Sequence, residues 1–436
     1  MLSAARLRLA QAAPHVRLLV LLVLVAVGAT HRASGSWNDD SRMATIQSLV
    51  EFHSLVIDHS DFVGTGDKVF VNGHFYSEKP PMPAVIGALI YLPLHAVGIE
   101  LHSGTNLAYF LITLFTIGGC WIAGTLAFFG SLRFTGLDPE RRLLATLALA
   151  FGSLYLTWAT TFNNHEMAAG CLAVGFYCLL RGRYAEGSIP RNLAAAGLFL
   201  SLAGTADMPT AIFYPIFFLY VLRDPALRKY SLYYLLPIAV TVVPALALNF
   251  SIHHSIVPVQ IVRAYFEYPD SPWQGSPSLS GMTANPWSSV GSYALRTLVS
   301  EKGFLVYNPF LVIAVWGLGR EIFRNNPFRY EAIAIGTGTA CLLGYYWVMT
   351  DNFAGWSYSI RWFVPLLPLL LFFLYGFFQA WNVGRRAVFN GLLGVSVLIA
   401  CVGAINPWSA LVYDDAPLLA NIKQLIAHIQ DPLIFP

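Results

Sequence analysis

The sequence predicts an all-α, polytopic membrane protein with about eleven transmembrane helices, and at most thirteen. Apolar residues make up 56% of the 436 residues and charged residues only 11%, against about 25% charged in an ordinary globular chain. So few charges could not cover a soluble core of this size. The apolar residues also gather in runs long enough to cross a bilayer. The formal net charge of +3 is too small to indicate a nucleic-acid partner.

Apolar runs place the transmembrane helices along the chain. Each run reaches the required length of roughly 20 residues, some only with their polar flanks. We expect the whole chain, 1–436, to form a single integral membrane domain. The eleven predicted spans lie at about 18–30, 106–132, 143–161, 167–181, 192–206, 208–222, 231–250, 304–319, 332–350, 362–380 and 390–405.

The distribution of basic residues orients these spans. When the apolar stretch 82–99 is not counted as a span, 17 of the 26 Lys and Arg residues fall on one side, which is then cytoplasmic. We therefore predict that 82–99 is a helix lying at the outer interface, with Pro83 and Pro93 limiting its regularity. We expect a multi-pass protein of the cell membrane, with its N-terminus on the cytoplasmic side. Residues 1–33 have the pattern of a signal peptide, and we expect a retained signal-anchor.

Under this topology the extracytoplasmic face holds the long loops 31–105 and 251–303 and the tail 406–436. It also holds 17 of the 23 acidic residues. We therefore expect an extracytoplasmic active site, with 31–105 as the catalytic loop. The second loop is rich in Pro, Ser, Gly and aromatic residues, a composition typical of a binding loop. The tail predicts a short amphipathic helix at the outer surface and carries no recognisable catalytic motif.

The first outer loop begins with the motif D-D-S-R-M-A at 39–44. A helix beginning at a cap such as Asn38 or Asp39 would place these acids at its N-terminus, which the helix dipole favours. That placement alone is the plain alternative to a catalytic role. The expected helix carries one apolar stripe, formed by Met43, Ile46, Leu49, Val50 and Leu55.

A second motif, F-Y-S-E-K-P-P at 75–81, lies later in the same loop. Glu78 and Lys79 precede a double proline that suits the start of the interfacial helix. An ordinary ion pair at the lipid headgroups is the plain alternative. One loop thus carries Asp39, Asp40 and Arg42 together with Glu78 and Lys79, all at the depth of lipid phosphates.

These two motifs resemble those of bacterial lipid-linked glycosyltransferases of the GT-C class, within the aminoarabinose-transferase and protein-mannosyltransferase-like group. That group carries D-E-x-R-Y-A and then E-K-P-P in its first outer loop; here Asp40 and Met43 stand where Glu and Tyr are usual. The resemblance implies a GT-C-like fold with interfacial helices in this loop and an extracytoplasmic active site. It covers the first 180 or so residues by motif and the remainder by hydropathy.

Other outer-face clusters supply further candidates. The resemblance implies a second acid in the turn T-T-F-N-N-H-E-M, where Glu166 is the only acidic residue, with His165 beside it; a plain helix turn is the alternative. Asp207 is equally well explained as a turn or as a site residue. Arg361 is either an interfacial anchor or a ligand for phosphate, whose oxygens its guanidinium fork fits.

The resemblance leaves metal dependence open. Some members of the resembled group hold a divalent ion between the acid of the E-K-P motif and a histidine of the later outer loop, whereas others need none. The candidate ligands here are Glu78, His253 and His254, of which the adjacent histidines could not both face one site.

Together these residues predict a membrane glycosyltransferase that moves a hexosyl or pentosyl group from a polyprenyl-phosphate donor to an acceptor hydroxyl, with inversion. The acceptor could be a lipid, a glycan or a protein. We expect Asp39 to be the base, with Asp40 and Glu166 sharing or supporting that role. Arg42, Lys79 and Arg361 would hold the donor phosphate, with Glu78 and His165 in support. A secondary transporter or a non-catalytic membrane scaffold are the alternatives, and near-absence of charge within the spans disfavours transport.

Overall fold

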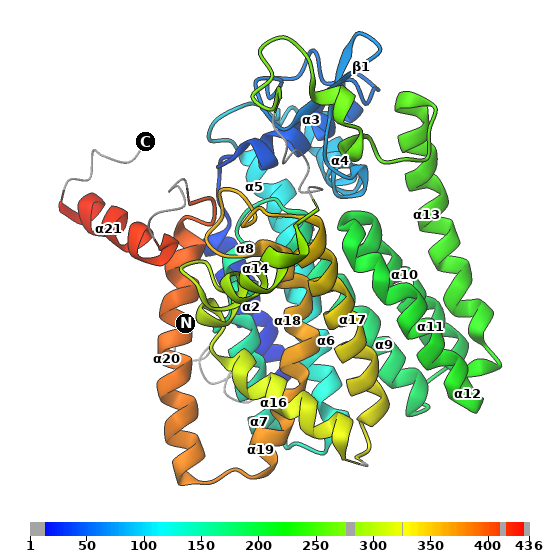
Figure 1. Cartoon of the computed structure of the whole chain (residues 1–436), viewed down its shortest axis with the longest axis vertical. Coiled ribbons are helices and arrows are strands. Elements are labelled where there is room, and N and C mark those ends of the chain that lie inside the picture. Colours follow the sequence, from blue (N-terminus) through cyan, green and yellow to red (C-terminus); the bar gives the residue numbers. More distant parts are fainter. Residues whose placement is uncertain (1–13, 276–283, 325, 410–415, 431–436) are drawn as a thin grey trace.

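A computed structural model describes residues 14–275, 284–324, 326–409 and 416–430 of the chain. Its helices stand side by side in a bundle, and a cap built from the first outer loop covers one end (Figure 1). Within the described residues the strands form a single two-stranded sheet. The predicted helical membrane fold is confirmed, with the addition of this small sheet. The N-terminal basic residues Arg6 and Arg8, which helped to orient the predicted topology, lie outside the described residues.

Among the described residues, five helical stretches are long and apolar enough to cross a membrane, or six if one bent pair counts as a single span. Shorter apolar helices, among them α2 (Pro14–Ala29), accompany them. The number eleven therefore stays a prediction. The five long stretches are Leu107–Thr135 (α5, η1, α6 and η2), Ser231–His253 (α13), Arg329–Met349 (α17), Arg361–Gln379 (η7, α18, η8 and α19) and Val383–Ile405 (α20).

Two predicted spans are broken, contrary to the prediction of continuous helices. The span 143–161 divides into α7 (Pro139–Ala150) and α8 (Leu154–Trp158). The chain turns at Gly152 and Ser153, and the Ser153 side chain caps α8. The residues after α8 then return to the cap, which is how Thr161 reaches the candidate site.

The span 304–319 is likewise divided, into α15 (Phe304–Tyr307) and α16 (Phe310–Phe323). The helical segments on either side of this break differ in direction by 99°. Pro309 has no N–H to continue the helix. The neighbouring Asn308 side chain donates to the Phe304 carbonyl (2.8 Å) and accepts from the Leu154 N–H (2.8 Å), and so fixes the bend against α8.

The cap begins with α3 (Trp37–Glu51), whose N-cap is Ser36 and not Asn38 or Asp39 as predicted. The Ser36 hydroxyl accepts the Asp39 N–H, which leaves the Asp39 carboxylate free for other partners. The predicted single apolar stripe is also wrong, because α3 is buried on most of its surface, polar residues included. It lies beneath the hairpin and beside α4, in the interior of the cap.

Strands β1 (Lys68–Val71) and β2 (His74–Ser77) pair in antiparallel register, with Val71 opposite His74. Asn72 and Gly73 both have positive φ (52° and 88°), as a two-residue hairpin turn requires. The hairpin leads directly into the E-K-P-P motif. Its turn therefore sets where Glu78 and Lys79 stand relative to α3.

Helix α4 (Pro81–Ala96) follows, with proline in its first turn as predicted. It packs against α3 and buries one face, while Leu89 and Leu92 stay exposed on the other. This one-sided burial agrees with an interfacial helix. The remaining helices are α9 (Asn164–Arg183), α10 (Ile189–Ala206), η3 (Met208–Ile212), α11 (Phe213–Arg223), α12 (Pro225–Arg228), η4 (Val259–Ile261), η5 (Arg263–Phe266), α14 (Trp287–Val299) and α21 (Pro417–Gln430).

Candidate active site

Asp39 lies in the first turn of α3, and its carboxylate is completely buried (0% exposed). Its Oδ2 atom accepts four hydrogen bonds, each from a different segment of the chain. The donors are the Gly35 N–H (3.2 Å), the Tyr109 hydroxyl (3.2 Å), the Thr161 hydroxyl (2.7 Å) and the Trp408 Nε1–H (3.0 Å). These bonds fix the orientation of the carboxylate.

The other carboxylate oxygen, Oδ1, is buried and has no hydrogen-bond partner within the described residues. Burial raises the pKa of Asp39 to about 7, although the hydrogen bonds from Thr161 and Gly35 and the charge of Arg42 partly oppose the rise. A carboxyl group with such a pKa exchanges protons near neutrality, as a general base must. Oδ1 is therefore the carboxylate oxygen that no hydrogen bond from the described residues occupies.

Asp40 lies beside this cluster but outside it. Its carboxylate accepts a hydrogen bond from the Ser34 hydroxyl, and burial raises its pKa. It shares none of the partners of the Asp39 carboxylate. The predicted catalytic role of Asp40 stays a prediction.

Arg42 is one helical turn beyond Asp39 and is also buried (1% exposed). Its Nη1 donates to the carbonyl of Asn38 (2.8 Å) and to the Asn38 side chain, and its Nη2 donates to the Asn164 Oδ1 (2.5 Å). Burial lowers the pKa of Arg42 to about 10, so the guanidinium stays charged at neutral pH. The bond to Asn164 ties the cap to the first turn of α9.

Lys79 stands between two carboxylates. Its ammonium pairs with Asp67 (2.8 Å) and with the neighbouring Glu78. Burial raises the pKa of Glu78, against the attraction of Lys79. Asp67 was not among the predicted site residues. Its only signal in the sequence is its position just before a short alternating strand, which does not distinguish it from a loop acid.

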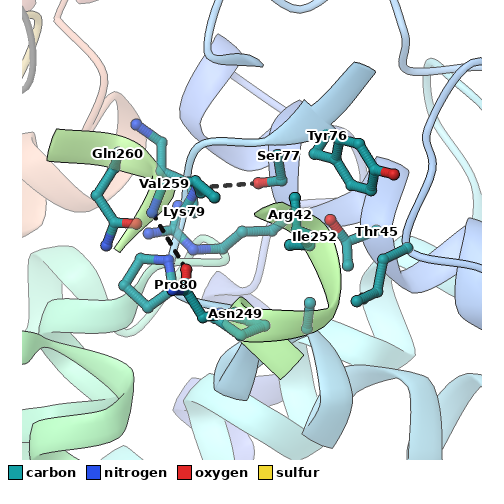
Figure 2. A pocket seen from close by; sticks show the side chains of 13 residues that line it. Arg42, Thr45, Tyr76, Ser77, Lys79, Pro80, Asn249, Ile252, Val259 and Gln260 are labelled. Carbon is teal, nitrogen blue, oxygen red and sulfur yellow. Dashed lines mark hydrogen bonds between the residues drawn. The ribbon is translucent and has the colours of Figure 1, made fainter. Parts of the chain in front are cut away.

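Arg42 and Lys79 line the same pocket (Figure 2). Side chains from the α3–α4 region form one part of its wall, and the end of α13 with the segment after it forms the other. The Asn249 side chain accepts the Val259 N–H (3.1 Å) and so closes that second wall. The lining residues are Arg42, Thr45, Leu55, Tyr76, Ser77, Lys79, Pro80, Pro81, Ala84, Asn249, Ile252, Val259 and Gln260.

Arg361 joins the same electrostatic group, in which it interacts with Asp39, Asp67 and Glu78 without forming a salt bridge among the described residues. Its Nη1 donates to the Trp356 carbonyl (3.3 Å). The guanidinium carbon lies 5.0 Å from the centre of the Trp408 ring, a cation–π contact. A cation with so few polar partners is well suited to bind an anion.

Trp408 is another site residue that sequence analysis missed, as it missed Asp67, Tyr109 and Thr161. It belongs to the tail in which no catalytic motif was recognised, and it donates to Asp39 while its ring lies under Arg361. Its ring also packs edge-on against Trp158 at 4.9 Å between ring centres. The surrounding N-P-W-S gives no signal for this placement, because the contact depends on a partner 369 residues away.

The first turn of α9 contributes two ionisable side chains, His165 and Glu166, which have different surroundings. His165 Nδ1 lies 2.8 Å from Asp207 Oδ2, and both side chains are buried. His165 interacts electrostatically with Arg42 and Arg361. The His165–Asp207 pair is therefore near the cationic residues of the site. Asp207 is thus a partner of a site residue as well as part of a turn.

Glu166 is not brought to Asp39. Its backbone N–H is capped by Asn163 (2.9 Å), but both carboxylate oxygens are buried and lack hydrogen-bond partners among the described residues. Its electrostatic neighbours are Cys120 and Tyr155, on the inner side of the bundle. The geometry therefore separates Glu166 from the cluster around Asp39, and its catalytic role stays a prediction.

The candidate metal ligands do not converge. His253 Nε2 lies 2.7 Å from the Val257 carbonyl, and its Nδ1 lies 3.2 Å from the Tyr265 hydroxyl. His254 has its ring against Phe250. Within the part of the chain that the structure describes, no group of three His, Cys, Asp or Glu side chains is placed to hold a metal ion. A metal at Glu78 stays a prediction, and no chemical step below depends on it.

No protein-family model matches the chain, and no curated protein matches it in sequence. Solved structures do match it in fold. ArnT from Cupriavidus metallidurans, bound to undecaprenyl phosphate, superposes with a TM-score of 0.52 and 14% identity, over 93% of this chain and 73% of ArnT. The oligosaccharyltransferase of Archaeoglobus fulgidus superposes with a TM-score of 0.53 and 13% identity, over 94% of this chain and 56% of that enzyme. The chain therefore has the GT-C fold, as its sequence predicts.

Proposed function

We propose that the chain is a membrane glycosyltransferase that transfers a sugar from a polyprenyl-phosphate donor to an acceptor hydroxyl at the extracytoplasmic face of the cell membrane. The observation that carries the proposal is the buried Asp39 carboxylate, whose Oδ2 is held by four donors while Oδ1 has no hydrogen-bond partner among the residues that the structure describes. The shared fold supports it, because ArnT was solved with undecaprenyl phosphate and the archaeal enzyme with a dolichol phosphate.

The donor phosphate belongs in the pocket lined by Arg42 and Lys79. As the sugar leaves, negative charge grows on the phosphate oxygens, and fixed cations stabilise that charge in a site from which water is excluded. The apolar part of the pocket wall, which includes Pro81 and Ala84 of α4, suits the first units of the lipid. Arg361 is a third cation within reach of the same charge.

The reaction then needs one proton transfer and one substitution. The acceptor O–H gives its proton to Oδ1 of Asp39, and the acceptor oxygen forms a bond to the anomeric carbon. The bond between that carbon and the phosphate oxygen breaks, and its electron pair stays on the polyprenyl phosphate. Attack opposite the phosphate inverts the anomeric centre through an oxocarbenium-like transition state.

Transfer of radiolabelled sugar from a panel of polyprenyl-phosphate donors, in membranes that hold equal amounts of each variant, tests the proposal. We expect Asp39→Asn to lower kcat by about 10²- to 10⁴-fold, the usual contribution of a general base. Arg42→Lys should raise the donor KM, because lysine lacks the planar fork. Asp61→Asn is the matched control, since Asp61 is an exposed acid of the same loop.

Wild-type rates from Asp39→Asn would overturn the assignment of the base. Because the candidate metal ligands do not converge in the described residues, we expect transfer to persist in EDTA. Loss of transfer in EDTA, restored by a divalent ion, would instead support the metal at Glu78.

A further inference from the structure

Three tryptophans from three separate outer segments meet beside the proposed active site. Trp37 opens α3, Trp273 follows η5, and Trp356 lies between α17 and η7. The Trp37 and Trp356 rings are stacked with their centres 6.4 Å apart and their planes within 21°. Trp273 meets Trp37 edge-on, also at 6.4 Å. We call these three residues the tryptophan cluster.

The cluster is exposed yet fixed in place. Trp37 is 45% exposed and Trp356 is 58% exposed, although burial of such rings is normally favourable. The Trp37 ring lies so close to Gly66 that a Cβ added there would come within 2.5 Å of it. Trp273 donates its Nε1–H to the Gly66 carbonyl (2.8 Å). Two of the three rings are therefore anchored to one turn of the cap.

Trp356 is presented by a strained turn. Ala354 has a φ of 65°, in the left-handed region that is unfavourable for a residue other than glycine, and Gly355 follows at 61°. The Asn352 side chain accepts the Gly355 N–H (2.6 Å), and the Lys302 ammonium donates to the Gly355 carbonyl (2.7 Å). These two bonds hold the turn in a strained conformation that leaves the Trp356 side chain exposed to solvent. Strained backbone of this kind is common at functional sites.

The cluster borders the proposed chemistry on both sides. Trp37 and Asp39 share the first turn of α3. The Trp356 carbonyl accepts a hydrogen bond from Arg361 (3.3 Å). Yet none of the three tryptophans lines the pocket that contains Arg42 and Lys79. Trp37 is therefore two residues from the proposed base in the chain, and the backbone of Trp356 contacts a cation, whereas the three rings lie outside the place proposed for the donor phosphate.

We propose that the tryptophan cluster is the acceptor site and binds a sugar ring, so that the acceptor is a carbohydrate. A pyranose ring has an apolar face of C–H groups that packs on an aromatic ring, while its hydroxyl groups point outward from the edge. One hydroxyl would then face Asp39. This inference rests on the proposed function and narrows its acceptor from any hydroxyl to that of a glycan or a glycolipid headgroup.

Acceptor kinetics test the inference, with a saccharide acceptor that the wild type uses. We expect Trp356→Ala to raise the acceptor KM about tenfold to thirtyfold, as loss of an interface tryptophan commonly does, and to leave the donor KM unchanged. Trp356→Phe should recover most of the affinity, because it keeps a flat ring. Trp287→Ala is the matched control, since Trp287 is 81% exposed and begins α14, outside the cluster.

A binding experiment separates this inference from the proposed function. The full chain is purified in a detergent without a sugar headgroup and dialysed to equilibrium against radiolabelled chitobiose, cellobiose or a serine-containing hexapeptide, with no donor present. Saccharide binding that Trp356→Ala weakens at least tenfold and Trp287→Ala does not supports the inference, even if no donor in the panel reacts. Peptide binding without saccharide binding overturns it. Equal effects of both alanine variants also overturn it, because they indicate tryptophans that merely anchor the protein at the membrane interface.

Discussion

At the scale of single residues, the two oxygens of the Asp39 carboxylate have different surroundings. Oδ2 accepts four hydrogen bonds, whereas no donor in the described part of the chain reaches Oδ1. Burial without full hydrogen bonding favours the neutral form of a carboxyl group, and here it raises the pKa of Asp39 to about 7. A surface aspartate would be too weak a base for a hydroxyl proton, so burial of Asp39 serves the proposed chemistry.

The pH dependence of transfer follows from this pKa. Only the ionised carboxylate can accept a proton, so we expect kcat to rise about tenfold between pH 6 and pH 8, with a midpoint near 7. Thr161→Val should move the midpoint to higher pH, because the Thr161 hydroxyl stabilises the ionised form. Thr160→Val is the control, since Thr160 bonds only to backbone carbonyls. Identical midpoints for all three proteins would contradict this account.

The same pKa predicts a pH-dependent stability. The pKa of Asp39 is higher in the folded chain than in the unfolded chain, so its ionisation destabilises the fold. That cost is absent below about pH 4 and complete above about pH 7. Asp39→Asn should therefore raise the Tm more at pH 8 than at pH 5, in thermal unfolding of the purified protein. A Tm difference that does not change with pH would argue against a raised pKa.

Trp408 makes two contacts that substitution can separate. Trp408→Phe removes the N–H that bonds Asp39 but keeps a ring beneath Arg361. We expect kcat to fall about tenfold or more, as for loss of a hydrogen bond to a charged group, with little change in the donor KM. Trp408→Ala should also raise the donor KM. Trp121→Phe is the control, because Trp121 is buried and its Nε1 has no hydrogen-bond partner in the described part of the chain.

Local motifs predicted the part of the site that lies in the first outer loop and missed the part that long-range contacts supply. Asp39, Arg42 and Lys79 were identified because charged residues are rare in this chain and because these three lie in short recognisable motifs. Thr161 and Trp408 sit 122 and 369 residues from Asp39. Nothing in their neighbouring residues distinguishes them from a turn threonine or an interfacial tryptophan.

At the scale of elements, helix α9 connects the helix bundle to the candidate active site. Its first turn supplies Asn164, which holds Arg42. Further along, α9 lies against α6 at glycines, as small residues allow between membrane helices. A Cβ added at Gly170 would come within 2.3 Å of the Cys120 carbonyl oxygen, and one added at Gly124 within 2.8 Å of the Gly170 Cα. The Cys120 carbonyl that obstructs a side chain at Gly170 belongs to the backbone and cannot rotate away.

Gly170→Val should therefore separate α6 from α9. We expect a loss of about 1–3 kcal/mol in stability, typical of overpacking, together with a raised donor KM as Asn164 moves from Arg42. Thermal unfolding and donor kinetics measure the two effects. Gly119→Ala, also in α6, should change neither, because nothing lies within 4 Å of the added Cβ. Wild-type stability of Gly170→Val would show that the helices are less closely packed.

Hydrophobic runs located the helices well and failed where the chain breaks a helix inside an apolar run. The break at Gly152 and Ser153 and the bend at Pro309 lie within the predicted spans 143–161 and 304–319. Hydropathy averages over such residues, whereas the packing of Asn308 against Leu154 fixes both breaks. The hairpin was predictable in principle, because Asn72-Gly73 between short alternating segments is a strong turn signal.

At the scale of the whole molecule, the cap and helix α12 lie at opposite ends of the bundle (Figure 1). The predicted topology puts the cap outside the cell and the loop around α12 inside. With the native cysteines replaced by alanine, we expect an impermeant thiol reagent to label Asp61→Cys on intact cells, and Arg228→Cys only after permeabilisation. Both positions are exposed. Labelling of Arg228→Cys on intact cells would show that the predicted topology is reversed.

The hydrogen bond from Trp408 to Asp39 joins two residues that lie 369 positions apart in the chain. At ribosomal speeds of about 5–20 residues per second, some 20–70 s separate the appearance of these two residues. During that interval Asp39 enters the membrane without the donor that completes its surroundings. A nascent chain, or one that ends before Trp408, would thus lack this hydrogen bond to the proposed base, so we expect sugar transfer to wait until Trp408 has been synthesised.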